Sequence, residues 1–230
     1  MLTTIDDGVL TARIHEATAG PELVSALEAV LSRVGGEVET LVLRFDGTPE
    51  AVAGDFPAWP PGDERPDMRY FARWDELLSR VSRLRAKTLA AYDGRVGAAA
   101  VQVGLVTDLR LASAAARLSP GSLAEGRFPG LGAWLLPKFV GLGRARRIFL
   151  LGEELTAAEA AGLGLVDLVD DSVEAVVATA VKALRAVTPE AAGFTRRLLD
   201  EAYLLDRGAA TELAKAARYQ VGRSGRWPTT

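Results

Sequence analysis

The sequence of 230 residues contains no cysteine and only one histidine, His15. A disulfide framework, a thiolate nucleophile and a cysteine metal site are therefore excluded, and a single histidine cannot form a zinc-binding cluster. No apolar run reaches the roughly 18 residues of a membrane-spanning helix. The first residues also lack the basic start and apolar stretch of a secretory signal. We therefore expect a cytoplasmic protein with no metal site and no membrane partner.

The sequence also has no excess of positive charge, because 27 Lys and Arg oppose 30 Asp and Glu. A net charge of −3 gives no general attraction to nucleic acid, so no nucleic-acid partner is expected and any phosphate-bearing ligand requires a local patch. Hydrophobic residues are abundant, at 49% of the sequence against 25% charged residues. This balance is typical of a folded globular protein with a sizeable core.

Apolar periodicity predicts an α/β protein in which strands and helices alternate. Thr156 and Glu159 form a capping box that should start a short helix, and Pro189 is placed as the first residue of another. The predicted strands are 9–14, 39–45, 88–92, 108–112 and 165–169, and the predicted helices open at residues 21, 74, 98, 156, 173 and 189. Helix 98–107 is rich in alanine, and a long loop is expected over residues 49–69.

The most specific motif in the sequence is the run Leu89–Ala112, LAAYDGRVGAAAVQVGLVTDLRLA. It resembles the crotonase pattern I-A-A-V-N-G-x-A-x-G-G-G-x-E-L-A-x-x-C-D-x-R-I-A. Further stretches that are similar to this family, in the family's order, are LVLR (41–44), AGD (53–55), FPGLG (128–132), LGEELTAAEA (151–160) and GLGLVD (162–167). Together they cover roughly residues 37–170 and identify the chain as resembling the enoyl-CoA hydratase/isomerase superfamily.

The resemblance implies a crotonase-like spiral of β-β-α units, followed by a helical C-terminal trimerisation region. The spiral core would span residues 1–170 and the helical region residues 171–230. It further implies an acyl-CoA or acyl-carrier-protein thioester as the substrate and a homotrimer or hexamer as the assembly. Coenzyme A would enter as part of the substrate, so no resident cofactor is expected.

The unit of strand, turn and helix at residues 88–107 directs the N–H groups of a helix N-terminus toward one point, where they can stabilise negative charge. Close packing is the alternative explanation for its small residues. By matching positions, the resemblance implies that the N–H of Ala99 binds the thioester carbonyl. The second donor is the N–H of Gly54 or of Asp55, and both stay open because the match in this loop is one residue short. Further substrate contacts by the same matching are Ala53, Ala98, Pro129 and Gly130.

The chain departs from the family at the two glutamates that hydratases use to position water and move a proton. Gln102 stands at the first position and can orient water but cannot exchange a proton at neutral pH. Ser122 stands at the second, and its hydroxyl titrates too high for a lone general acid. Glu125 is the best remaining carboxylate, because burial beside an acyl chain would raise its pKa toward neutrality. The alternative is a solvated loop glutamate.

Two sets of cations are candidates for the phosphates of coenzyme A, with a solvated face as the alternative. They are Arg144, Arg146 and Arg147, and Arg83, Arg85 and Lys87. The expected function is that of a hydratase/dehydratase/isomerase-like enzyme acting on an acyl thioester, in secondary metabolism. The alternative is a catalytically reduced crotonase-fold protein that acts as accessory or ligand-binding partner of a polyketide-type synthase.

Overall fold

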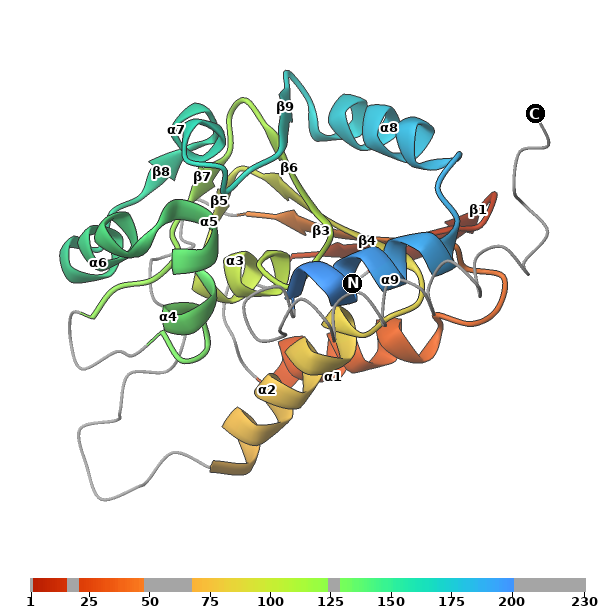
Figure 1. The fold of residues 1–230 in the computed structure, drawn as a ribbon, viewed down its shortest axis with the longest axis horizontal. Coiled ribbons are helices and arrows are strands. Elements are labelled where there is room, and N and C mark those ends of the chain that lie inside the picture. The colour runs from red at the N-terminus through yellow and green to blue at the C-terminus, as the bar shows by residue number, and fades with distance from the viewer. Residues whose placement is uncertain (1, 16–20, 48–67, 124–128, 201–230) are drawn as a thin grey trace.

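A computed structural model describes residues 2–15, 21–47, 68–123 and 129–200, and a six-stranded sheet forms its centre (Figure 1). The strand order is β1-β2-β3-β4-β6-β9, with β1 antiparallel to β2 and every other neighbouring pair parallel. These strands are β1 (Leu2–Asp6), β2 (Val9–Ile14), β3 (Thr40–Asp46), β4 (Lys87–Asp93), β6 (Leu109–Ser113) and β9 (Leu168–Asp170). A smaller sheet has the order β5-β7-β8, from β5 (Arg95–Val96), β7 (Arg117–Leu118) and β8 (Leu155–Thr156).

Helices connect the parallel strands and cover both faces of the large sheet (Figure 1). In chain order they are α1 (Pro21–Ser32), α2 (Met68–Ser82), α3 (Ala98–Gly104), α4 (Gly132–Leu135), α5 (Pro137–Val140), α6 (Leu142–Leu151), α7 (Ala157–Gly162), α8 (Val173–Leu184) and α9 (Pro189–Asp200). This is the mixed α/β architecture that the sequence predicted, with a helical region at its C-terminal side. The division at residue 170 and the assembly of several copies stay predictions.

The two faces of the sheet have separate cores because successive strand residues point in opposite directions. In β3, Leu41, Leu43 and Phe45 face α1 and α2 within the larger core. Val42 faces the other way and packs with Val173 of α8 in a smaller core. Each of these side chains is at most 2% exposed, so both faces of the central strands are closed to solvent.

Several predicted boundaries are wrong by a few residues. The alanine-rich helix ends at Gly104 rather than Thr107, because the N–H and the hydroxyl of Thr107 both donate to the Gly104 carbonyl in a turn. Strand β9 begins at Leu168 rather than residue 165, since the amide of Leu165 donates back to Ala160 in α7. Met68 already belongs to α2, and the rest of the predicted loop, residues 49–67, lies outside the described residues.

Strand β1 was not predicted at all. It pairs with β2 through a tight turn in which Asp7 and Gly8 both have positive φ, at 42° and 74°. An Asp-Gly pair with two left-handed residues is the turn that joins hairpin strands most readily, so the signal was present in the sequence. Along the described part of the chain, no helix is both long and apolar enough to cross a membrane. The cytoplasmic location stays a prediction.

Candidate active site

The site begins where β4 ends, at the start of α3. Gly97 precedes the helix in an extended conformation and offers no side-chain cap. The first intrahelical hydrogen bond of α3 runs from the Val101 N–H to the Gly97 carbonyl. The N–H groups of the three alanines before Val101 have no acceptor within an α-helix. Their side chains are almost fully buried, so these donors lie in a place shielded from bulk water.

The alanines that replace the family's glycines fit this backbone without strain. Among the described residues, Asp7 alone has a positive φ without being glycine, so Ala98, Ala99 and Ala100 do not need the left-handed conformation. The added methyl groups are buried, at 1%, 1% and 7% exposure. The first turn of α3 is therefore regular helix, with buried methyl groups where the family's pattern has glycine.

The position of α3 against the sheet is fixed by Gly104 and Tyr92. A Cβ atom on Gly104 would lie 1.7 Å from the Tyr92 hydroxyl oxygen, so any side chain there would force Tyr92 or α3 to shift. The same hydroxyl donates to the Ala100 carbonyl at 3.5 Å. Burial raises the pKa of Tyr92, which keeps the phenol protonated and available as a donor. The helix thus lies close to β4 at Ala100 and Gly104.

Gln102 lies on the inner side of α3 and is fully buried. Its Oε1 accepts a hydrogen bond from Trp74 Nε1 of α2 at 3.2 Å. Its Nε2 donates to the Pro129 carbonyl at 3.0 Å. The polar role of Trp74 was not predicted from the sequence, although a buried indole N–H needs an acceptor.

Pro129 also approaches the start of α3 from a second direction. A Cβ atom on Gly121 would lie 3.5 Å from Pro129 Cβ and 3.7 Å from Ala98 Cβ, which places Gly121 between them. Gly121 has φ 136°, a conformation that favours glycine. Gly130, next to Pro129, has φ 52° and no neighbour within 4 Å of its Cβ position. The structure therefore brings the predicted residues Ala98, Gln102 and Pro129 together.

Ser122 follows Gly121 and lies against the end of α6. A Cβ atom on Gly152, the left-handed residue that ends α6, would lie 3.0 Å from Ser122 Oγ. The N–H of Leu123 donates to the Phe149 carbonyl at 3.2 Å, which anchors the same segment. Of the other predicted site residues, Ala53, Gly54, Asp55 and Glu125 lie outside the described residues.

The cationic residues considered for phosphate binding are partly committed to the protein itself. Lys87 is 2% exposed, and its Nζ donates to the carbonyls of Leu184 and Val187 at the end of α8, at 3.1 Å and 2.9 Å. Arg147 forms an ion pair with Glu153 at 2.6 Å. Lys87 is thus a structural cap for α8, and not a surface cation.

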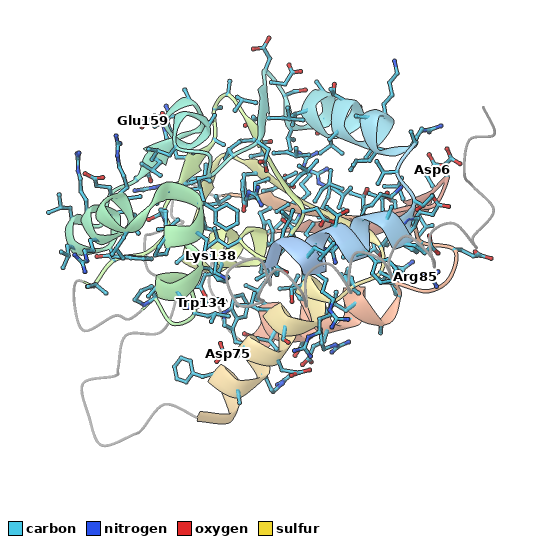
Figure 2. All side chains as sticks on the ribbon, viewed as in Figure 1. Asp6, Asp75, Arg85, Trp134, Lys138 and Glu159 are labelled. Atoms are coloured by element: carbon cyan, nitrogen blue, oxygen red, sulfur yellow. The ribbon has the colours of Figure 1, made fainter. Side chains whose placement is uncertain are left out.

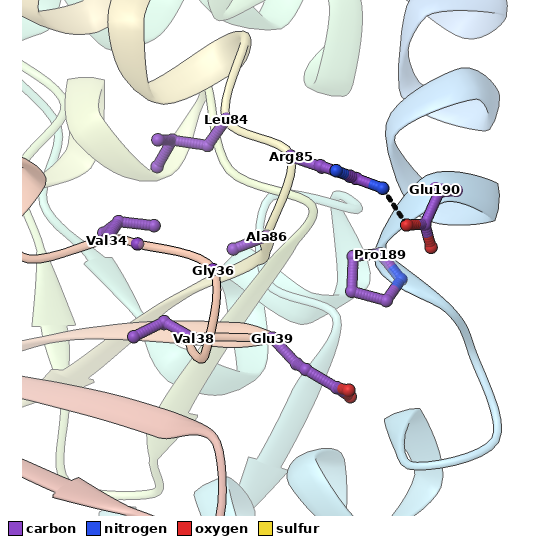
Figure 3. A pocket seen from close by; sticks show the side chains of 10 residues that line it. Val34, Gly36, Val38, Glu39, Leu84, Arg85, Ala86, Pro189 and Glu190 are labelled. Atoms are coloured by element: carbon purple, nitrogen blue, oxygen red, sulfur yellow. Dashed lines mark hydrogen bonds and ion pairs between the residues drawn. The ribbon is translucent and has the colours of Figure 1, made fainter. Parts of the chain in front are cut away.

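Two clefts lie at the other end of the sheet, near the beginning of β3 and β4. Figure 3 shows the first, of about 530 Å³, which the Arg85–Glu190 ion pair borders. The second, of about 830 Å³, shares Leu84, Arg85, Pro189 and Glu190 with it. Arg85 lines both clefts and Arg83 the second, and both are among the cations considered for the phosphates of coenzyme A. Neither cleft is lined by a predicted catalytic or acyl-binding residue, and α3 starts beyond the opposite ends of the strands.

Comparison with known proteins gives a consistent family. The sequence profile named enoyl-CoA hydratase/isomerase matches residues 16–217. The chain is 26% identical to an enoyl-CoA-hydratase of Amycolatopsis orientalis, over 85% of this chain and 87% of the relative. It is 27% identical to the trans-2-decenoyl-[acyl-carrier-protein] isomerase of Streptococcus mutans, over 72% of this chain and 67% of the relative.

Solved structures agree with this result. An enoyl-CoA hydratase/isomerase from Cupriavidus metallidurans CH34 superposes with a TM-score of 0.77 at 28% identity, over 95% of this chain and 86% of that one. A Thermobifida fusca YX protein, crystallised in complex with acetoacetyl-CoA, has the same fold, with a TM-score of 0.80 at 24% identity over 98% of this chain and 94% of that one. The chain therefore belongs to the enoyl-CoA hydratase/isomerase family of enzymes, the crotonase superfamily that its motifs indicated.

Proposed function

We propose that this chain acts on an acyl thioester and binds the thioester carbonyl through two backbone N–H groups. One is the N–H of Ala99, and the other is that of Gly54 or Asp55. The observation that carries the proposal is the start of α3, where buried N–H donors follow an uncapped Gly97 in regular helical geometry. Such donors stabilise an oxyanion more strongly than a neutral carbonyl, because the charge develops in a place shielded from water.

The chemistry is that of an enolate or a tetrahedral oxyanion. Removal of a proton from the acyl chain moves negative charge onto the thioester oxygen, where the two N–H groups receive it. A group that takes and returns the proton is also needed, and Glu125 is the carboxylate proposed for this role. Ser122 would contribute a hydroxyl at the position of the family's second glutamate. Isomerisation, dehydration, ring closure and thioester hydrolysis all fit these groups, whereas hydration by two glutamates does not.

The thioester carrier is coenzyme A or an acyl carrier protein. Both are supported by similar proteins, since one neighbour was crystallised with acetoacetyl-CoA and one relative is named as an acyl-carrier-protein isomerase. Coenzyme A is then a part of the substrate and not a resident cofactor. The proposal extends to a role in secondary metabolism, on the departures from the hydratase motif, and to a homotrimer or hexamer, on family resemblance.

The alternative is a protein that has kept the fold but acts as an accessory or ligand-binding partner of a polyketide-type synthase. The replacement of both glutamates, by Gln102 and Ser122, favours it. The two functions differ in their need for a proton carrier. An enzyme requires Glu125 for turnover, whereas an accessory protein keeps its stimulating effect without that carboxylate.

The proposal is tested by calorimetric titration of acyl-CoA esters and non-hydrolysable CoA thioethers into the wild-type chain and Ala99→Pro. Proline at the second residue of α3 removes the proposed N–H donor, in a turn where no intrahelical hydrogen bond is lost. Ala158→Pro is the matched control, because it makes the same change at the second residue of α7 on the exposed surface. We expect binding by the wild type and the control and weaker binding by Ala99→Pro, with circular dichroism unchanged in all three. Equal binding by all three would contradict the assignment of Ala99.

A further inference from the structure

We propose that Gln102 is a positioning residue, whose amide clamps the segment Pro129–Gly132 to α3 and α2 and so fixes one wall of the thioester site. The inference rests on the proposed function for what that wall contacts, but the clamp itself is a property of the protein without substrate. It assigns to Gln102 a role different from that of the glutamate which the family's hydratases carry at this position.

The amide of Gln102 can be oriented in only one way. The indole N–H of Trp74 is a donor and requires Oε1, while the Pro129 carbonyl is an acceptor and requires Nε2. Rotating the amide by half a turn would place two donors together and two acceptors together, and both hydrogen bonds would be lost. Because Gln102 is fully buried, the lost bonds could not be replaced from bulk water. The side chain is therefore held by α2 on one side and by Pro129 on the other.

The surroundings of the amide are fitted to it closely. A Cβ atom on Gly132 would lie 3.1 Å from Gln102 Cγ and 3.2 Å from both Cδ and Nε2. A glycine at this place lets the first turn of α4 rest directly on the glutamine side chain. The Pro129 carbonyl meanwhile accepts a second hydrogen bond, from the Gly132 N–H at 2.9 Å. One carbonyl thus joins the clamp to the start of α4.

The clamp lies close to the proposed carbonyl-binding donors. Pro129 and Ala98 both border Gly121, because a Cβ atom on that glycine would lie 3.5 Å and 3.7 Å from their Cβ atoms. Ala98 is the residue before the proposed donor Ala99, in the same first turn of α3. A displacement of Pro129 would therefore loosen the packing on the first turn of α3, whereas a rigid Pro129 holds it in place.

An amide suits this position better than a carboxylate would. An ionised glutamate could accept from the Trp74 indole, but it has no proton to donate to the Pro129 carbonyl. Both polar ends of Gln102 are used by the protein and none of its surface is exposed, so the position presents neither a water site nor a proton carrier to a substrate. A reaction that moves a proton within the acyl chain, breaking one C–H bond and forming another, needs no water here.

Three variants test the clamp by hydrogen exchange of the amides in residues 131–136. Gln102→Met removes both hydrogen bonds at similar volume, Gln102→Glu removes the donor to Pro129, and Val103→Ala is the matched control, a buried truncation in the same helix. We expect exchange in this segment to be roughly tenfold faster in Gln102→Met than in the control, the effect of losing one or two buried hydrogen bonds. CoA-thioether affinity should fall with it.

Gln102→Glu supplies a readout that loss of packing alone would not change. Burial raises the pKa of a carboxyl group, and the protonated acid can again donate to Pro129. Exchange protection and ligand affinity of Gln102→Glu should therefore recover as the pH is lowered, while Gln102→Met shows no such recovery. Wild-type protection in both variants would overturn the clamp. Faster exchange in Gln102→Met, together with a wild type that binds neither a CoA ester nor an acyl-carrier-protein thioester, would leave the clamp standing and reject the proposed function.

Discussion

Arg196 of α9 holds the carboxylate of Asp108 with two hydrogen bonds, from Nε to Oδ1 and from Nη2 to Oδ2, each 2.7 Å long. The same guanidinium donates to the carbonyls of Ser82, Leu84 and Ala86, which end α2 and lead into β4. Asp108 in turn accepts from the N–H and the hydroxyl of Thr88. One side chain therefore ties the last described helix to the central sheet.

Removal of this guanidinium should destabilise the chain strongly. The side chains of Arg196 and Asp108 are 9% and 21% exposed. Removing the guanidinium leaves the largely buried Asp108 carboxylate without its cation, so we expect Arg196→Ala to lower the free energy of unfolding by about 3–5 kcal/mol. Arg185→Ala is the control, because Arg185 and its partner Asp7 are 67% and 69% exposed and their pair should contribute less than about 1 kcal/mol. Urea denaturation measures both changes, and similar losses would contradict this role of Arg196.

A side chain at Gly104 should destabilise the chain. Gly104→Ala places a methyl group 1.7 Å from the Tyr92 oxygen, so we expect a loss of about 1–3 kcal/mol or more in unfolding free energy. Gly143→Ala is the matched control, since its Cβ has no neighbour within 4 Å and alanine favours the helix by roughly 0.5–1 kcal/mol. Adding Tyr92→Phe to Gly104→Ala should recover part of the loss. If the double variant is no more stable than Gly104→Ala alone, the clash is not with the Tyr92 hydroxyl.

Asp46 should stabilise the chain more at neutral than at acid pH. Burial alone raises the pKa of its carboxyl, but hydrogen bonds from Arg44 and Arg13 outweigh burial and hold the pKa below its ordinary value. The unfolded state then binds more protons, so the contribution is complete above about pH 4 and lost as the pH falls through the folded pKa. The difference in unfolding free energy between wild type and Asp46→Asn should shrink on acidification, as followed by urea denaturation. A difference independent of pH would refute this.

Lys138 lies over the Trp134 ring, with Nζ 3.2 Å from the ring centroid (Figure 2). Trp134 is 58% exposed, so water weakens the cation–π attraction, and we expect a coupling of about 0.5–1 kcal/mol. A double-mutant cycle with Lys138→Met and Trp134→Leu, by thermal or urea unfolding, measures this coupling. Additive single changes would show that the two side chains contribute independently and that the contact adds nothing.

Glu125→Gln separates the enzyme from the accessory protein. If Glu125 moves the proton, its amide variant should lose activity by about 10²- to 10⁴-fold, because an amide is no acid or base at neutral pH. Glu153→Gln is the control, since Glu153 is paired with Arg147 at the end of α6. Turnover of a matched acyl thioester is the measurement. An unchanged stimulating effect on a partner synthase, without turnover of its own, would favour the accessory role.

Local signals in the sequence determined most of the elements. The helical spacing of Trp74, Leu77 and Val81 and the capping box of Thr156 and Glu159 depend on neighbours within a few residues, and the structure contains both helices and the cap. The motif series also sufficed to indicate the family. The assignments of Ala53, Gly54, Asp55 and Glu125 stay predictions, since these residues lie outside the described part of the chain.

Contacts between distant segments were decided by the tertiary structure alone. Gln102 and Pro129 stand 27 residues apart, and Arg196 and Asp108 stand 88 apart, so no local pattern marks either pair. A buried amide or guanidinium must find partners wherever the packed helices and strands bring an acceptor or a donor. The sequence by itself determined most of the long helices and strands and indicated the family. Packing determined that Gln102 has two protein partners, because only the folded chain brings Trp74 and Pro129 to the two ends of one amide.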